Sequence, residues 1–192
     1  RTQHTKIRKE KTFIIVQEKG VKIIDNNNQL LNFDINKIKN TFDRSSSGLT
    51  RIFIQELTED VSNAVYNEIP IDELKTLIIN VSKARIGDHY EYSALTSRLV
   101  INRLYEEILN TKLFAENLQQ RYEEEFSNYL EKGIAYDLIN PELRTFNLNK
   151  IAKALVAERD FNFYYLGVQT LYDRYLLRQR EHPKKVFELP QW

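Results

Sequence analysis

Hydrophobic residues between positions 49 and 108 recur every three or four residues, which is the spacing of amphipathic helices that bury one face. The spacing runs through residues 49–68, resumes after Pro70, and resumes again after Gly87-Asp88. The positions predicted to share the buried faces are Ile54, Leu57, Val61 and Ala64, then Leu74, Leu77, Ile78 and Val81, then Ile101, Leu104, Tyr105 and Ile108. Three helices are therefore predicted in this part of the chain.

A different pattern precedes these helices. Residues 21–25 and 30–33 are short β-prone segments, and Asn26-Asn27-Asn28-Gln29 joins them. Asn tolerates the left-handed backbone that tight hairpin turns require, so a β-hairpin is predicted here. Asp34 stands at the N-cap of a further short helix, which Ser45-Ser46-Ser47-Gly48 interrupts. Residues 1–20 are predicted to be a basic tail that leads into a strand.

Beyond residue 110 the helical spacing continues with more Tyr and Phe. Helices are predicted over residues 118–130, 148–157 and 163–177. This change in composition indicates a domain boundary near residues 110–116. The predicted fold class is mainly α, with a small β-hairpin plus four-helix domain over residues 21–110 and an α-helical domain over residues 111–192.

The aromatic side chains of the last predicted helix admit two interpretations. Tyr164, Tyr165, Tyr172 and Tyr175 could stack on nucleotide bases, but their helical spacing among leucines favours burial in a core. The residues expected in the core of the second domain are Phe161, Tyr165, Val168, Leu171 and Tyr175.

Composition narrows the possible functions. Lys and Arg number 28 against 27 Asp and Glu, so the net charge of +1 gives no general attraction to nucleic acid or membrane, and neither partner is expected. Cys is absent, which excludes thiol chemistry from this chain alone. His4, His89 and His182 lie far apart, so no metal site is predicted. Because the apolar runs are too short to span a bilayer, a cytoplasmic location is expected.

Few residues are arranged for catalysis. The carboxylates of Glu123, Glu124 and Glu125 point in different directions on a helix and are typical of a solvated face. Gly-rich phosphate loops are absent. One phosphate-binding arrangement remains, because the hairpin leads into a helix N-terminus that carries Lys37 one turn in, and helix N-termini attract anions. An ordinary N-cap followed by an exposed lysine is the simpler explanation of the same residues.

Two blocks of sequence resemble ribonucleotide reductase large subunits. The first consists of the hairpin, residues 33–38 (FDINKI), residues 71–74 (IDEL) and residues 92–99 (YSALTSRL). It is similar to the ATP-cone regulatory domain at the start of these subunits. The first predicted domain is therefore expected to be an ATP-cone.

The second block is more specific. Residues 159–167 (RDFNFYYLG), 170–171 (TL), 174–177 (RYLL) and 188–191 (ELPQ) resemble the helical N-terminal domain of class I large subunits. The resemblance implies the N-terminal part of a ribonucleoside-diphosphate reductase, an oxidoreductase of deoxyribonucleotide biosynthesis for DNA replication. In this family the radical cysteine and the reducing cysteines lie in a barrel that would begin about where this sequence ends. The chain alone is therefore expected to be a fragment without catalysis.

The same resemblance implies several partners. They are the remainder of the large subunit, a radical-generating small subunit and further copies of the large subunit. ATP and dATP with Mg²⁺ would be allosteric effectors, and no catalytic cofactor is expected in this chain. The alternative hypothesis is a free-standing helical module that binds nucleotides or proteins without catalysis. The residues that the resemblance assigns to the effector site are Asn28, Asp34 and Lys37.

The effector site implied by the resemblance is incomplete. Asp25 stands where the family has a Lys, and Ile71 and Leu104 stand about where it often has a Thr and a Lys. A carboxylate at position 25 repels a triphosphate. We therefore expect a degenerate ATP-cone, in which the fold is retained and the ATP affinity is lowered or lost.

Overall fold

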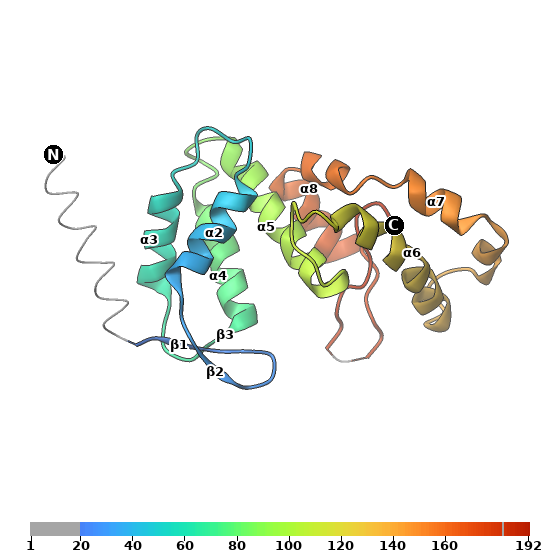
Figure 1. The fold of residues 1–192 in the computed structure, drawn as a ribbon, viewed down its shortest axis with the longest axis horizontal. Helices are drawn as coiled ribbons and strands as arrows, with labels where there is room; N and C mark the ends of the chain where they lie inside the picture. The colour runs from blue at the N-terminus through green and yellow to red at the C-terminus, as the bar shows by residue number, and fades with distance from the viewer. Residues whose placement is uncertain (1–19, 182) are drawn as a thin grey trace, which may run out of the picture. The chain divides into compact units, whose positions relative to one another are not determined.

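The computed structural model describes residues 20–181 and 183–192 (Figure 1). These residues form two units, the first ending at Leu95 and the second beginning at Thr96. The division falls inside helix α5 (Glu91–Ile108). The assignment of residues 21–110 to a regulatory domain and of residues 111–192 to a helical domain stays a prediction. The tail and strand expected before Gly20 lie outside the described residues.

The hairpin predicted from the sequence is present. Strands β1 (Lys22–Ile24) and β2 (Leu30–Asn32) pair antiparallel. The turn between them places Asn28 at a φ of 59°, a left-handed conformation that Asn adopts more readily than most residues. A third strand, β3 (Ile69–Pro70), pairs parallel with β1 and completes a sheet of order β2-β1-β3. The sequence did not predict β3, because two residues carry no periodic pattern.

Three helices lie wholly within the described part of the first unit: the first was predicted from its N-cap, and the other two were predicted from hydrophobic spacing. They are α2 (Ile35–Ser45), α3 (Ile54–Ala64) and α4 (Ile71–Ala84). Figure 1 shows them side by side, with the small sheet at one end of α2 and α4. Their buried apolar side chains supply the core of the unit, at roughly 25 cal/mol of stabilisation per Å² of apolar surface removed from water. These side chains are Ile35, Ile38, Phe42, Leu57, Val61, Leu74 and Ile78. Ala64, which was predicted to share a buried face, is instead exposed, because it is the last residue of its helix.

The second unit contains the remainder of α5 and three further α-helices. These helices are α6 (Leu118–Ala135), α7 (Leu148–Ala154) and α8 (Tyr165–Thr170). Two 3₁₀ helices, η1 (Pro141–Thr145) and η2 (Ala157–Asn162), lie on either side of α7 in the sequence. The fold class is therefore mainly α with a small β element, as predicted. Within the part of the chain that the structure describes, no helix has the length and hydropathy needed to cross a lipid bilayer.

Aromatic residues dominate one cluster of buried side chains in the second unit. It contains Phe126, Tyr129, Leu130, Ala152 and Phe187. The indole of Trp192 packs against this cluster, with its ring centroid 5.1 Å from that of Tyr129. The C-terminal residues of the chain are thereby part of the packing of this unit.

The prediction for the last helix is partly wrong. Val168 is fully buried as expected, but Tyr175 is 69% exposed and Tyr164 is 56% exposed. The backbone conformation explains why Tyr175 is exposed. Helix α8 continues into a π-helical turn, η3 (Leu171–Tyr175), which widens the helix. The N–H of Leu176 donates to the carbonyl of Leu171 at 2.9 Å, and Leu176 is buried where Tyr175 was expected. The remaining predicted core residues are only partly buried, namely Phe161, Tyr165 and Leu171.

Candidate functional site

The hairpin turn is held by the side chain of Asp25. Its Oδ1 atom accepts hydrogen bonds from the backbone N–H groups of Asn27 at 2.9 Å and Gln29 at 2.7 Å. Asn28, with its positive φ, supplies the tight bend of the same turn. The carboxylate therefore has a structural role at the position where the resemblance led us to expect a cation.

The N-terminus of α2 is closed by its own cap. The Oδ1 atom of Asp34 accepts the N–H of Asn36 at 2.9 Å, and the carbonyl of Asp34 accepts the N–H of Lys37 at 3.1 Å. The side chain of Lys37 is exposed. A carboxylate at this N-cap occupies the place that a phosphate would take at a helix N-terminus, and it carries the same sign of charge.

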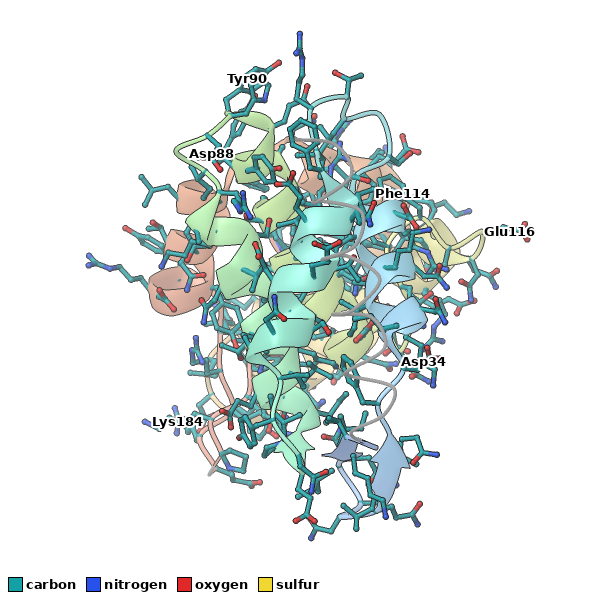
Figure 2. The ribbon with its side chains drawn as sticks, turned by 90° about the vertical axis from the view of Figure 1, so that its left-hand side faces the viewer. Asp34, Asp88, Tyr90, Phe114, Glu116 and Lys184 are labelled. Carbon is teal, nitrogen blue, oxygen red and sulfur yellow. The ribbon has the colours of Figure 1, made fainter. Side chains whose placement is uncertain are left out.

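The three residues assigned to the effector site lie at the sheet end of the first unit. Figure 2 shows Asp34 at the start of α2, while Asp88 and Tyr90 lie at the opposite end of the same unit. Asn28 lies in the hairpin turn and Lys37 lies in the first turn of α2. Within residues 20–181, no hydrogen bond or ion pair joins the side chains of these three residues.

Two further positions of the implied effector site carry no polar group. Ile71 is the first residue of α4 and is partly buried. Leu104 is fully buried. Lys37 therefore remains as the cation at a matched position.

The second unit contains a buried polar network that the sequence did not predict. The carboxyl group of Asp160 in η2 is fully buried. Its Oδ2 atom lies 2.8 Å from the hydroxyl oxygen of Tyr105 and 3.0 Å from that of Tyr122. Its Oδ1 atom accepts a hydrogen bond from the Nε2 atom of Gln191 at 2.7 Å. The network joins α5, α6, η2 and residues 188–192, which are called the C-terminal segment below.

Burial controls the protonation of these groups. The loss of hydration raises the pKa of Asp160, and hydrogen bonds from Gln191, Tyr105 and Tyr122 oppose this rise. Burial also raises the pKa of Tyr105 and of Tyr122. Both phenols are therefore fully protonated at neutral pH.

A second polar contact anchors the same C-terminal segment. The carboxylate of Glu188 accepts a hydrogen bond from the hydroxyl of Tyr129, and it also accepts the backbone N–H of Leu177 at 2.8 Å. Burial, together with the hydrogen bond to Glu188, raises the pKa of Tyr129. Glu188 thus connects Tyr129 in α6 to Leu177, which lies shortly after η3 in the sequence.

The signal for these contacts was present in the second block of sequence. Asp160 lies in the quoted residues 159–167, and Glu188 and Gln191 lie in the quoted residues 188–191. The structure brings the two quoted segments together through the hydrogen bond between Asp160 and Gln191. Asp160, Glu188 and Gln191, three of the residues that carry the resemblance, therefore make structural contacts within the helical unit.

Comparison with known proteins agrees with the resemblance. No protein-family model matches the chain. A ribonucleoside-diphosphate reductase subunit alpha from Chlamydia muridarum is 34% identical over 120 residues, which cover 62% of this chain and 11% of that protein. The subunit alpha from Helicobacter pylori (strain J99) is 29% identical over 173 residues, which cover 89% of this chain and 21% of that protein. The chain matches the N-terminal region of reductase large subunits.

Viral proteins give the same result. The ribonucleoside-diphosphate reductase large subunit from Monkeypox virus is 26% identical over 181 residues, which cover 88% of this chain. The chain spans 11% to 22% of the length of these three relatives. The similarity predicted from the two blocks of sequence is thus confirmed, and it extends over both units.

Proposed function

We propose that this chain is the N-terminal regulatory and structural part of a ribonucleoside-diphosphate reductase large subunit. The observation that carries this proposal is the similarity to the Helicobacter pylori subunit over 89% of the chain. The complete subunit would make deoxyribonucleotides for DNA replication by radical thiol chemistry. Because the chain has no Cys, the thiols of that reaction would belong to a catalytic barrel outside it.

This proposal implies three kinds of partner. They are the remainder of the large subunit, a radical-generating small subunit and other copies of the large subunit, in the cytoplasm. The sequence that continues from Trp192 in the gene tests the proposal directly. We expect it to encode barrel strands and paired cysteines, and to support reduction of ribonucleoside diphosphates when the complete subunit is mixed with its small subunit. A continuation without cysteines would favour the free-standing interaction module instead.

For the first unit we propose a degenerate ATP-cone with a mainly structural role. Three features support weak or absent binding of ATP and dATP. The carboxylate of Asp25 is committed to the hairpin turn, Asp34 caps the N-terminus of α2, and Ile71 at the start of α4 is apolar. Triphosphate sites normally combine several cations or a bound Mg²⁺, and Lys37 alone does not offset the charge and hydration of a triphosphate.

Calorimetry on this chain with Mg-ATP and Mg-dATP tests this second proposal. We expect no binding in the micromolar range for the wild-type chain. Micromolar binding that is lost in Lys37→Ala and retained in Lys39→Ala, an exposed lysine on the same helix, would show a working effector site. Loss in Lys22→Ala, on β1, would instead show that the hairpin supplies the phosphate ligand.

A further inference from the structure

The hydrogen bonds around Asp160 require more protons than the neighbouring donors supply. The hydroxyl of Tyr105 lies 2.8 Å from Oδ2 of Asp160 and 3.1 Å from the carbonyl oxygen of Ala157. A phenol carries one proton, so Tyr105 can donate a full hydrogen bond to one of these two acceptors. The hydroxyl of Tyr122 has a single proton as well, and it points to Oδ2 of Asp160 at 3.0 Å.

The amide of Gln191 uses both of its protons in the same network. Its Nε2 atom donates to Oδ1 of Asp160 at 2.7 Å and to the carbonyl oxygen of Val156 at 2.8 Å. The two phenols and this amide therefore supply one, one and two protons for the hydrogen bonds that surround Asp160. One contact, between Tyr105 and Asp160 or between Tyr105 and Ala157, lacks a proton if Asp160 is ionised.

The surroundings of Asp160 offer no charge to balance a carboxylate. The groups that face it from α5, α6 and the C-terminal segment are the neutral side chains of Tyr105, Tyr122 and Gln191. On its own helix, Glu158 and Arg159 are exposed. Among the described residues, Asp160 forms no ion pair, and an isolated buried carboxylate without a cation is strongly disfavoured.

We propose that Asp160 is protonated at neutral pH and that it donates this proton to the hydroxyl oxygen of Tyr105. Tyr105 then donates its own proton to the carbonyl of Ala157, so each hydrogen bond of Asp160 and of Tyr105 has one proton. The carboxylic acid joins α5 and α6 to Gln191 and thereby holds the C-terminal segment on the helical unit. This inference is independent of the proposed reductase function.

The network has a defined pH dependence. The acid is neutral in the folded chain and ionises near pH 3.9 in the unfolded chain. Between that pH and the pKa of Asp160 in the folded chain, the folded state binds one more proton than the unfolded state. The contribution of Asp160 to the folding equilibrium constant therefore falls by about tenfold per pH unit across this window, and attachment of the C-terminal segment weakens at alkaline pH.

Infrared spectroscopy of the 192-residue chain tests the proposal in the wild type. We expect a carbonyl band of a protonated carboxylic acid at pH 7 that is absent in Asp160→Asn. The matched control is Glu158→Gln, an exposed acid on the same helix, in which the band remains. A wild-type spectrum at pH 7 with carboxylate bands alone would overturn the proposal, whether or not the variant folds.

Unfolding measured from pH 5 to pH 9 gives a second test. Asn has the shape of Asp and offers an N–H to the hydroxyl oxygen of Tyr105, where the proposal places the acidic proton. Because Asn does not ionise, Asp160→Asn is expected to become more stable relative to the wild type as the pH rises. Glu158→Gln is expected to follow the wild-type profile. A wild type whose stability relative to Asp160→Asn is constant across this range would overturn the proposal.

Discussion

The carboxylate of Glu91 accepts a hydrogen bond at 2.7 Å from the backbone N–H of Arg51, which lies 40 positions earlier in the sequence. The same carboxylate accepts the N–H of Thr50 at 2.8 Å. Glu91 is in the first turn of α5, and residues 50 and 51 belong to the loop between α2 and α3. One buried side chain thus fixes the path of this loop in the first unit.

Replacement of Glu91 by Gln is expected to lower the midpoint of thermal unfolding at pH 7. The hydrogen bonds from Arg51 and Thr50 lower the pKa of Glu91 in the folded chain. Its contribution to stability is therefore present above about pH 4.3, the unfolded value, and is lost as the pH falls through the lowered folded value. Thermal scans from pH 7 to pH 3 should show a smaller acid-induced loss in Glu91→Gln than in the wild type.

The exposed Glu68 provides the control for that experiment. Glu68→Gln is expected to unfold like the wild type across the whole pH range. If Glu91→Gln also behaves like the wild type, the two hydrogen bonds do not hold the loop in solution.

Phe42→Ala is expected to destabilise the first unit by about 3–5 kcal/mol. The side chain of Phe42 on α2 is fully buried, and its removal leaves a cavity. The measurement is the free energy of unfolding in urea, followed by far-ultraviolet circular dichroism. Phe53 is 62% exposed, so Phe53→Ala is the matched control and should cost about 0.5 kcal/mol or less. Equal losses in the two variants would contradict the packing described for α2.

Replacement of Gly133 in α6 by Ala is expected to destabilise the chain, because there is no room for a methyl group at this position. A Cβ added there would lie 2.3 Å from Cδ1 and 2.6 Å from Cγ1 of Ile139. Gly133→Ala should therefore lose roughly 1–3 kcal/mol through overpacking, although Ala favours a helix over Gly by about 1 kcal/mol. Thermal unfolding measures the difference.

Two variants control the Gly133 experiment. Gly87→Ala is expected to be tolerated, because no atom lies within 4 Å of a Cβ built at that position. Combining Gly133→Ala with Ile139→Ala should recover part of the overpacking loss. A Gly133→Ala chain that is more stable than the wild type would mean that α6 and Ile139 separate readily.

The side chain of Asp25 is expected to stabilise the hairpin turn. Asp25→Ala removes the acceptor of two backbone N–H groups and should cost about 1 kcal/mol. Asp25→Lys restores the cation that a phosphate site needs, yet it should lose the same turn contacts. Urea unfolding compares both variants with Asn26→Ala, an exposed turn residue that is expected to behave like the wild type.

Local patterns predicted the first unit well. The N-cap at Asp34 and the left-handed turn residue Asn28 depend on a few neighbouring residues, and both are found in the structure. Strand β3 depends on pairing with β1, which lies more than 40 residues away, so two residues of sequence could not indicate it. Helices α3 and α4 follow the predicted hydrophobic spacing because each helix buries one face, except that Ala64 at the end of α3 is exposed.

The second unit was less predictable for two physical reasons. The exposure of Tyr175 depends on a π-helical turn, which a period of 3.6 residues does not describe. The role of Asp160 depends on partners 38 and 55 positions earlier, Tyr122 and Tyr105, which are brought near by helix packing alone. The quoted sequence blocks included Asp160 but neither tyrosine, and they did not indicate what Asp160 contacts.

The position of Trp192 makes its intrinsic fluorescence a reporter of the packing of the second unit. It is the single Trp of the sequence, and its ring centroid lies 5.5 Å from that of Tyr122 and 6.3 Å from that of Phe126. Indole emission shifts to longer wavelength when the ring moves from an apolar contact into water. Excitation of this one side chain therefore follows detachment of the C-terminal segment without any added label, and energy transfer from the neighbouring tyrosines reports the same event independently.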